Sequence, residues 1–307
     1  MRAITYSEFG SADVLTLSDV DEPRVGPDSV LIEVRAVGLN PVDWKAREGY
    51  LDGLVESHFP VIPAWDVAGV VIKKGADTPE FEVGDEVYAY ARKDVLSDGM
   101  LAERVAVPVR ALARKPVSLS FEEAAAVPLA ALTALRSVRR VSVGMGDHVL
   151  IHNGSGGVGG FGIQLARLAG GTVVATASER NHDYLRKLGA TPVTYGEGLV
   201  ERALEASPEG YDAVLDFVGD GALAGNEPLL REGARVASIA GYKDALALDG
   251  SIVWVRPDAE GLTELAGLFD EGSLRVEVAE VFDLADAADA YRLLESGHVR
   301  GKVVVKV

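Results

Sequence analysis

The stretch HNGSGGVGG, residues 152–160, places five glycines in nine positions near the middle of the 307-residue chain. Within it, Gly154-x-Gly156-x-x-Gly159 follows the apolar run VLI and leads into the helical pattern VGGFGIQLARLAG. In such a loop the glycines permit a tight turn, let backbone N–H groups approach a pyrophosphate, and let the helix lie close to the strand. A glycine-rich turn without a ligand is the alternative. The flanking strand and helix favour a dinucleotide site.

Short apolar runs alternate with helical patterns around this stretch. Strands are expected at HVLIHN, GTVVATAS, TPVTY, DAVLDFVG, ARVASIAG and SIVWV, and helices near residues 158–168, 181–188, 199–206 and 223–230. Such alternation is typical of right-handed βαβ units with a parallel sheet covered on both faces. It predicts an α/β fold with a doubly wound, Rossmann-type sheet.

The first third of the chain has the pattern of β-structure instead. SVLIEVRAVGLN, residues 29–40, alternates apolar and polar positions, and FEVGDEVYAY, residues 81–90, has two short apolar runs about a Gly-Asp turn. Both patterns fit a small barrel or sandwich. A helical region is expected from about Phe121, with Ser120 as its N-cap, and the tail adds two helical patterns and a closing strand.

Composition excludes several classes of function. Thirty Lys and Arg against 47 Asp and Glu leave a net charge of -17, which repels nucleic acid and anionic membranes. The chain has no cysteine, so disulfides, thiolate metal sites and a cysteine nucleophile are excluded. The histidines lie at no metal-ligand spacing, and no metal is expected. The start, MRAITYSEFG, lacks signal or transit character, so we expect a cytoplasmic protein.

The end of the second expected strand, VVATASERN, bears on the choice of cofactor. An NAD site usually has an acid there for the ribose hydroxyl, whereas an NADP site replaces the acid and supplies a cation. Ser178 stands where the acid is expected, and Arg180 follows as a cation for a 2'-phosphate. Glu179 becomes the NAD-type acid if the strand ends one residue later. The pattern favours NADPH.

Six motifs occur along the chain in a familiar order: GLNPVDWKAREG, PAWDVAGVV, FEVGDEVYAY, PLAALTAL, NGSGGVGGFGIQLA and GHVRGKVVVKV. Together they resemble the zinc-independent medium-chain dehydrogenases/reductases, specifically the quinone oxidoreductase and enone (alkenal) reductase branch. The resemblance covers nearly the whole chain. It implies a GroES-like, mainly-β catalytic domain of residues 1–117 and 257–307, with a Rossmann dinucleotide-binding domain of residues 118–256 inserted between.

The chain departs from the zinc-bearing relatives of this superfamily at their metal ligands. Those relatives carry a cysteine where this chain has Asn40, and a His-Glu pair where it has Trp65 and Asp66. Zinc stabilises the alkoxide during alcohol oxidation as a Lewis acid. Hydride addition to a quinone or to a C=C bond conjugated to a carbonyl puts charge on an enolate oxygen instead, which one or two hydrogen-bond donors stabilise.

The resemblance also implies catalytic residues. Lys45 is expected beside the nicotinamide ribose and the substrate, although a surface lysine is the alternative. Asn40 is expected as a polar cleft residue or a turn former, and Tyr50 as a hydrogen-bond or proton donor or an ordinary aromatic at the rim. Solvent is the other proton source. Trp44 and Trp65 are expected as walls of an apolar pocket or as packing residues.

Cofactor contacts are implied at positions along the whole chain. Lys45 and Thr133 are assigned to the nicotinamide end, and the glycine loop to the pyrophosphate. The remaining expected contacts are Gly154, Gly156, Gly157, Val158, Gly159, Ser178, Arg180, Asn181, Tyr195, Val218, Ile239, Arg300 and Gly301. Val218 and Ile239 are alternatively simple core residues.

These inferences predict an NADPH-dependent reductase of a small electrophilic substrate, a quinone or an enone. Two other readings stay open: a zinc-free carbonyl or alcohol oxidoreductase, and a non-catalytic NADPH-binding scaffold or redox sensor. Relatives often dimerise through the last Rossmann strand, so SIVWV, residues 251–255, is the expected edge of a homodimer. A buried strand has the same pattern.

Overall fold

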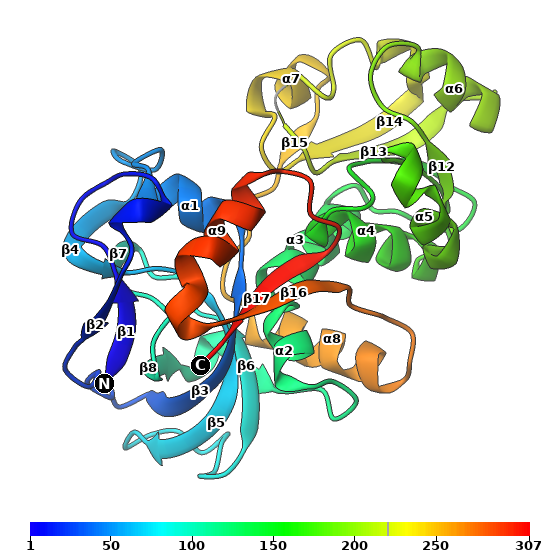
Figure 1. The fold of residues 1–307 in the computed structure, drawn as a ribbon. Helices are drawn as coiled ribbons and strands as arrows, with labels where there is room; N and C mark the ends of the chain where they lie inside the picture. The colour runs from blue at the N-terminus through cyan, green and yellow to red at the C-terminus, as the bar shows by residue number, and fades with distance from the viewer. Residues whose placement is uncertain (220) are drawn as a thin grey trace. The chain divides into compact units, whose positions relative to one another are not determined.

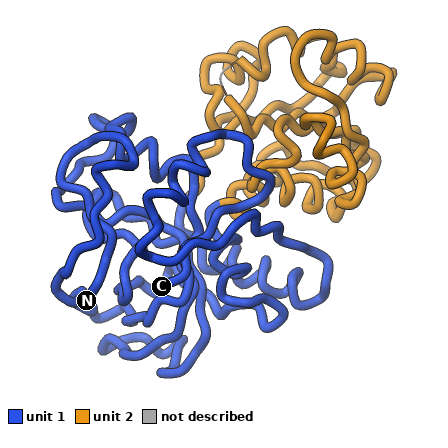
Figure 2. The backbone as a smooth tube through the Cα atoms, viewed as in Figure 1, with its two compact units in different colours: residues 1–129, 256–307 blue, residues 130–255 orange. Residues whose placement is uncertain are grey.

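The computed structural model describes residues 1–219 and 221–307. They form two compact units: residues 1–129 with 256–307, and residues 130–255 (Figure 2). We call these the first and the second unit. Residues 118–129, which the sequence assigns to the Rossmann domain, belong to the first unit.

The first unit is mainly β-structure, as expected (Figure 1). Its main sheet has seven strands in the order β16-β17-β3-β5-β6-β9, with β8 also paired to β3, and two small sheets pair β1 with β2 and β4 with β7. The strands are β1 (Arg2–Thr5), β2 (Thr16–Asp19), β3 (Ser29–Leu39), β4 (Glu56–Ile62), β5 (Asp66–Lys74), β6 (Glu86–Tyr90), β7 (Val95–Asp98), β8 (Arg104–Pro108), β9 (Leu112–Arg114), β16 (Val278–Asp283) and β17 (Lys302–Lys306).

Strand β3 organises this unit because three strands pair with it. Its first half pairs with β8 and β5, and its second half pairs with β5 and β17, which comes from the other end of the chain. The pairing buries Val30, Ile32 and Val34 in the core. The helices of this unit are α1 (Pro41–Arg47), α2 (Phe121–Ala125), α8 (Ala259–Asp270) and α9 (Ala287–Glu295).

The second unit contains a six-stranded parallel sheet in the order β12-β11-β10-β13-β14-β15. This confirms the predicted doubly wound topology. The strands are β10 (His148–His152), β11 (Thr172–Thr176), β12 (Thr191–Val193), β13 (Tyr211–Asp216), β14 (Leu230–Ser238) and β15 (Ser251–Ile252). The helices are α4 (Gly157–Leu168), α5 (His182–Leu188), α6 (Leu199–Ala206) and α7 (Tyr242–Ala247), and α3 (Pro128–Arg140) enters this unit from the first.

Some local predictions were wrong. The helix expected near residues 223–230 is a series of turns followed by the 3-10 turn η4 (Glu227–Leu229). Gly221 and Gly225 adopt positive φ angles of 81° and 74° there, which a helix does not accept. Helix α7 was not predicted, and in FEVGDEVYAY only the second apolar run is a strand. The helical region after Ser120 is two helices, because α3 starts at Pro128.

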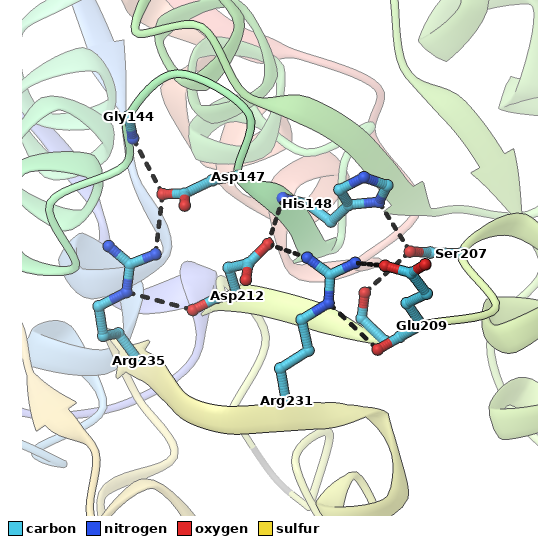
Figure 3. A network of polar contacts seen from close by, with 9 residues as sticks. Gly144, Asp147, His148, Ser207, Glu209, Asp212, Arg231 and Arg235 are labelled. Carbon is cyan, nitrogen blue, oxygen red and sulfur yellow. Dashed lines mark hydrogen bonds and ion pairs between the residues drawn. The ribbon is translucent and has the colours of Figure 1, made fainter.

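A network of charged side chains braces the amino-terminal end of the parallel sheet (Figure 3). The Asp212 carboxylate accepts hydrogen bonds from the His148 N–H at 2.8 Å and from the Arg231 guanidinium at 2.6 Å. Arg235 pairs with Asp147 at 2.8 Å, and the Ser207 hydroxyl lies 2.8 Å from His148 Nδ1. These polar groups therefore bind one another, and they lie at the end of the sheet opposite the glycine loop.

Among the described residues, no helix combines the length and the apolar character that a bilayer span requires.

Candidate cofactor and substrate sites

The glycine loop joins β10 to α4, the context predicted from the sequence. Asn153 takes a positive φ of 60°, and Gly156 is the N-cap of α4. A Cβ atom on Gly159 would lie 2.0 Å from the Asn153 carbonyl oxygen, and one on Gly154 would lie 2.8 Å from the Ala175 Cβ. Helix, loop and strand therefore pack so closely that side chains are excluded at these positions.

The amino-terminal end of α4 fits a diphosphate. The first N–H groups of a helix have no partner within it, and they carry the positive end of the helix dipole. Here those groups belong to Gly157, Val158 and Gly159, and the glycines leave them accessible to a bulky anion. The residues present therefore fit the pyrophosphate of a dinucleotide.

The end of β11 lies beside this loop. Asn181 is buried, and its amide donates hydrogen bonds to the Ser155 hydroxyl at 3.2 Å and to the Ser178 hydroxyl at 3.4 Å. Glu179 and Arg180 are both exposed in the 3-10 turn η3 (Glu179–Asn181). Asn181 thus links the glycine loop to the position that selects between NADP and NAD, and either charged neighbour is accessible to a ribose or its phosphate.

The other expected cofactor residues have different environments. Val218 is 44% exposed and Tyr195 is 58% exposed, whereas Ile239 is half-buried and Thr133 on α3 is buried. Val218 is the second residue after β13, and Ile239 directly follows β14. The last two expected cofactor residues lie near the carboxyl terminus. The Arg300 guanidinium pairs with the Glu277 carboxylate at 2.6 Å, and Gly301 has a φ of 79° that suits a turn.

The expected catalytic residues lie on and just after α1. Lys45 Nζ lies 5.6 Å from the centre of the Trp44 ring. Tyr50 is 70% exposed, and its ring packs edge-on against Trp44 at a centroid distance of 6.2 Å. The structure therefore brings Lys45 and Tyr50 together around one indole ring, with the phenol accessible to a ligand. Trp65 is only 5% exposed and packs on Tyr90, as a core residue does.

Asn40 begins α1 and belongs to a buried ion group, which consists of Asn40, Asp43, Asp66 and Lys302. Its backbone N–H donates to the Asp43 carboxylate at 2.7 Å, and its side-chain amide donates to the Asp66 carboxylate at 2.9 Å. The Lys302 ammonium donates to the Asn40 side-chain oxygen and to the Leu39 carbonyl. Asn40 is 2% exposed, so its polar atoms are committed to these neighbours.

Asp66 joins this group to α3. One carboxylate oxygen accepts from Asn40, and the other accepts from the Leu129 N–H in the first turn of α3 at 2.9 Å. Lys302 lies 3.8 Å from Asp66. The group therefore holds the starts of both α1 and α3, the helices that carry Lys45 and Thr133.

Burial dominates the electrostatics of the ion group. It raises the pKa of Asp43 to about 8 and the pKa of Asp66 to about 6, against the opposing pull of Lys302. Burial also lowers the pKa of Lys302, which Asp66 and Asp43 oppose. The folded state thus favours the neutral acids. That contribution to stability is complete below the unfolded-state pKa of about 3.9. It is lost as the pH rises through about 6 for Asp66 and about 8 for Asp43.

The ion group contains residues that sequence reasoning did not select. Asp43 follows Asn40 by three residues in a capping box, a local signal that could have identified it. Lys302 has no comparable signal, since it is one basic residue in a short closing strand 262 positions from Asn40. In the described part of the chain, no three His, Cys, Asp or Glu side chains gather as metal ligands.

Comparison with known protein families matches two regions of the chain. Residues 26–117 match the alcohol dehydrogenase GroES-like domain, and residues 188–305 match the family described as zinc-binding dehydrogenase. The second description names a metal, whereas the resemblance implies that this chain has asparagine, tryptophan and aspartate at the positions of the zinc ligands.

Individual relatives agree over the full length. The chain is 37% identical to the chloroplastic NADPH-dependent alkenal/one oxidoreductase of Arabidopsis thaliana, covering 99% of this chain and 79% of that protein. It is 32% identical to the chloroplast envelope quinone oxidoreductase homolog of the same plant, over 100% and 98%. The quinone oxidoreductase structure from Coxiella burnetii superposes with a TM-score of 0.91 at 36% identity, covering 100% of this chain and 99% of that one.

The glycine loop yields a direct prediction. Gly159→Ala places a Cβ 2.0 Å from a backbone oxygen, so the loop must move and affinity for NADPH should fall at least about tenfold. Gly160→Ala is the matched control one residue along, because its Cβ meets only the end of the Tyr184 side chain, at 2.8 Å. NADPH fluorescence titration measures both. Equal affinity for the two variants would contradict the proposed role of the loop.

Proposed function

The chain belongs to the zinc-independent quinone oxidoreductase and enone reductase branch of the medium-chain dehydrogenases/reductases, and on that basis we propose its reaction and its site residues. The reaction is hydride transfer from NADPH to a quinone, or to the C=C bond of an α,β-unsaturated carbonyl. The observation that carries the proposal is the closely packed glycine loop at the start of α4, which fits the pyrophosphate of a dinucleotide.

The substrate class follows from the donors that the chain offers. Bound NADPH supplies the hydride. Lys45 hydrogen-bonds to the carbonyl oxygen and stabilises the negative charge that develops on it. Hydride adds to the β-carbon of an enone, and the Tyr50 phenol, which is exposed beside Trp44, or else solvent, gives the proton to the α-carbon or the oxygen of the resulting enolate. With a quinone the proton goes to the quinol oxygen. Asn40 acts by holding the start of α1, since its side chain is occupied.

We propose the cofactor contacts as follows. The N–H groups of Gly157, Val158 and Gly159 bind the pyrophosphate. Ser178 and Arg180 bind the 2'-phosphate, with Asn181 orienting Ser178. The remaining proposed contacts are Lys45, Thr133, Gly154, Gly156, Tyr195, Val218, Ile239, Arg300 and Gly301. If Glu179 binds the ribose instead of Arg180, NADH will replace NADPH as the better cofactor.

A homodimer is supported by the edge of the parallel sheet. Strand β15 pairs only with β14 in the described sheet, and Tyr242, Leu246 and Trp254 around it are 43%, 65% and 39% exposed. An uncovered strand edge beside apolar side chains favours pairing with a second copy across a two-fold axis. Sedimentation equilibrium at micromolar concentration should give twice the chain mass of 32.4 kDa. The mass of a monomer would contradict the proposal.

We also propose a cytoplasmic location, in keeping with a net charge of -17 that repels anionic membranes. Two of the plant relatives are named as chloroplast proteins. Recovery with an organelle or membrane fraction would contradict the proposed location.

Lys45 provides the test of the reaction. NADPH oxidation should be followed at 340 nm with 9,10-phenanthrenequinone, an alkenal and a saturated aldehyde. The quinone or the alkenal should turn over and the saturated aldehyde should not. Lys45→Ala should lower kcat/KM by about 100-fold, the usual loss for a donor to a developing oxyanion. Lys73→Ala is the matched control, because Lys73 is an exposed lysine on β5 of the same unit.

Two results would contradict the proposal. Turnover of the saturated aldehyde at the rate of the alkenal would indicate carbonyl reduction. Tight NADPH binding without turnover of any acceptor would indicate a cofactor-binding scaffold.

A further inference from the structure

The carboxyl ends of three strands carry a buried polar cluster that the proposed reaction leaves unexplained. It consists of His152 on β10, Asp216 on β13, Asn226 after β13 and Ser238 on β14, each at most 2% exposed. None of the four is an expected site residue. The strand order reverses direction between β10 and β13, and open α/β sheets bind their ligands outside the carboxyl ends at such a point.

Asp216 holds the loop that follows its own strand. One carboxylate oxygen accepts from the N–H of Val218 at 2.8 Å and from the N–H of Gly219 at 3.1 Å. The second oxygen accepts from the Ser238 hydroxyl at 2.6 Å. Burial lowers the pKa of His152, the register partner of Asp216, so the charge of the carboxylate is balanced mainly by neutral donors. Such donors are effective when they are fixed in place.

Ser238 holds the loop after the next strand in the same way. Its hydroxyl oxygen accepts from the N–H of Gly241 at 2.7 Å and from that of Ala240 at 3.2 Å, while it donates to Asp216. The two loops also touch. A Cβ atom on Gly219 would lie 2.7 Å from the Ala240 Cβ, and one on Gly241 would lie 2.8 Å from the Asp216 carboxylate.

The same loops connect to the glycine loop. The side-chain amide of Asn153 donates to the Phe217 carbonyl at 3.4 Å, and the Asn153 N–H donates to the Thr176 hydroxyl at 2.9 Å. Hydrogen bonds therefore run along the carboxyl edge from β11 to β14. The glycine loop and the end of β11 stand at the beginning of this series of hydrogen bonds. The loops that carry Val218 and Ile239 stand at its end.

We propose that Asp216 and Ser238 are positioning residues for the cofactor. They hold the loops after β13 and β14 in one fixed arrangement, and these loops bind the nicotinamide half of NADPH. The inference rests on the proposed function. It assigns these two residues no contact with the reacting atoms. Their effect is on the affinity for NADPH. Loops that are already ordered before the cofactor binds lose less conformational entropy on binding.

Ser238→Ala tests this, since it removes the hydroxyl that joins the two loops. The variant should raise the KM and Kd for NADPH about tenfold, with kcat and the KM for the alkenal or quinone changed by less than about threefold. Ser207→Ala is the matched control. Ser207 is an equally buried serine at the opposite end of the same sheet, where its hydroxyl bonds to the Gly210 carbonyl at 2.8 Å, and its loss should leave the KM for NADPH unchanged.

Asp216→Asn provides a second variant that breaks the same pair with little change of shape, and it decides the question if Ser238→Ala fails to fold. NADPH affinity equal to the wild type in the folded variants would overturn the inference. So would an equal rise in KM for Ser207→Ala, because the effect would then be a general loosening of the unit. Wild-type protein that does not bind NADPH would overturn the proposed function itself, and the fluorescence titration of wild type separates the two failures.

Discussion

The ammonium group of Lys302 lies in the interior of the first unit, where it contacts Asn40 and faces Asp66 at 3.8 Å. Two buried carboxyl groups without a counter-charge would be costly, since burial disfavours their charged forms. Lys302 opposes that effect for both Asp66 and Asp43. The amide of Asn40 then bridges the ammonium and the Asp66 carboxylate. One basic residue of the closing strand thereby fixes the start of α1 and the first turn of α3.

The ion group bears on the proposed reaction because of the sequence positions that two of its members occupy. The resemblance implies that Asn40 and Asp66 stand where zinc-bearing relatives carry metal ligands, and here the Lys302 ammonium contacts Asn40 and lies 3.8 Å from Asp66. The side-chain polar atoms of Asn40, Asp66 and Lys302 are already bound to protein partners, so these three residues offer a substrate no polar group. We propose that the donors to a developing oxyanion are instead Lys45 on α1 and Tyr50 just after it. Such donors suit an enolate or a quinol oxygen better than an alkoxide.

The sequence predicted what is local and missed what tertiary contacts create. The glycine loop and the parallel sheet followed from spacing and alternation, and the Ser120 cap followed from residue type. The helix expected near residues 223–230 does not form, since Gly225 within the segment and Gly221 just before it have positive φ angles. Lys302 was missed because a buried charge cannot be told from a surface charge by sequence alone, whereas the capping-box spacing of Asn40 and Asp43 was a local signal that could have identified Asp43. The Asp216 and Ser238 pair also went unrecognised, because its residues are 22 positions apart and meet only through sheet register.

We propose that this chain reduces activated double bonds or quinones without a metal. The most direct test is NADPH-dependent turnover of the preferred acceptor before and after dialysis against a strong chelator, with the zinc content of both samples measured. The account predicts the same kcat in both samples and less than stoichiometric zinc in each. A loss of activity that stoichiometric zinc restores would contradict it, because the ion group of Asn40, Asp66 and Lys302 would then have to open to admit a metal.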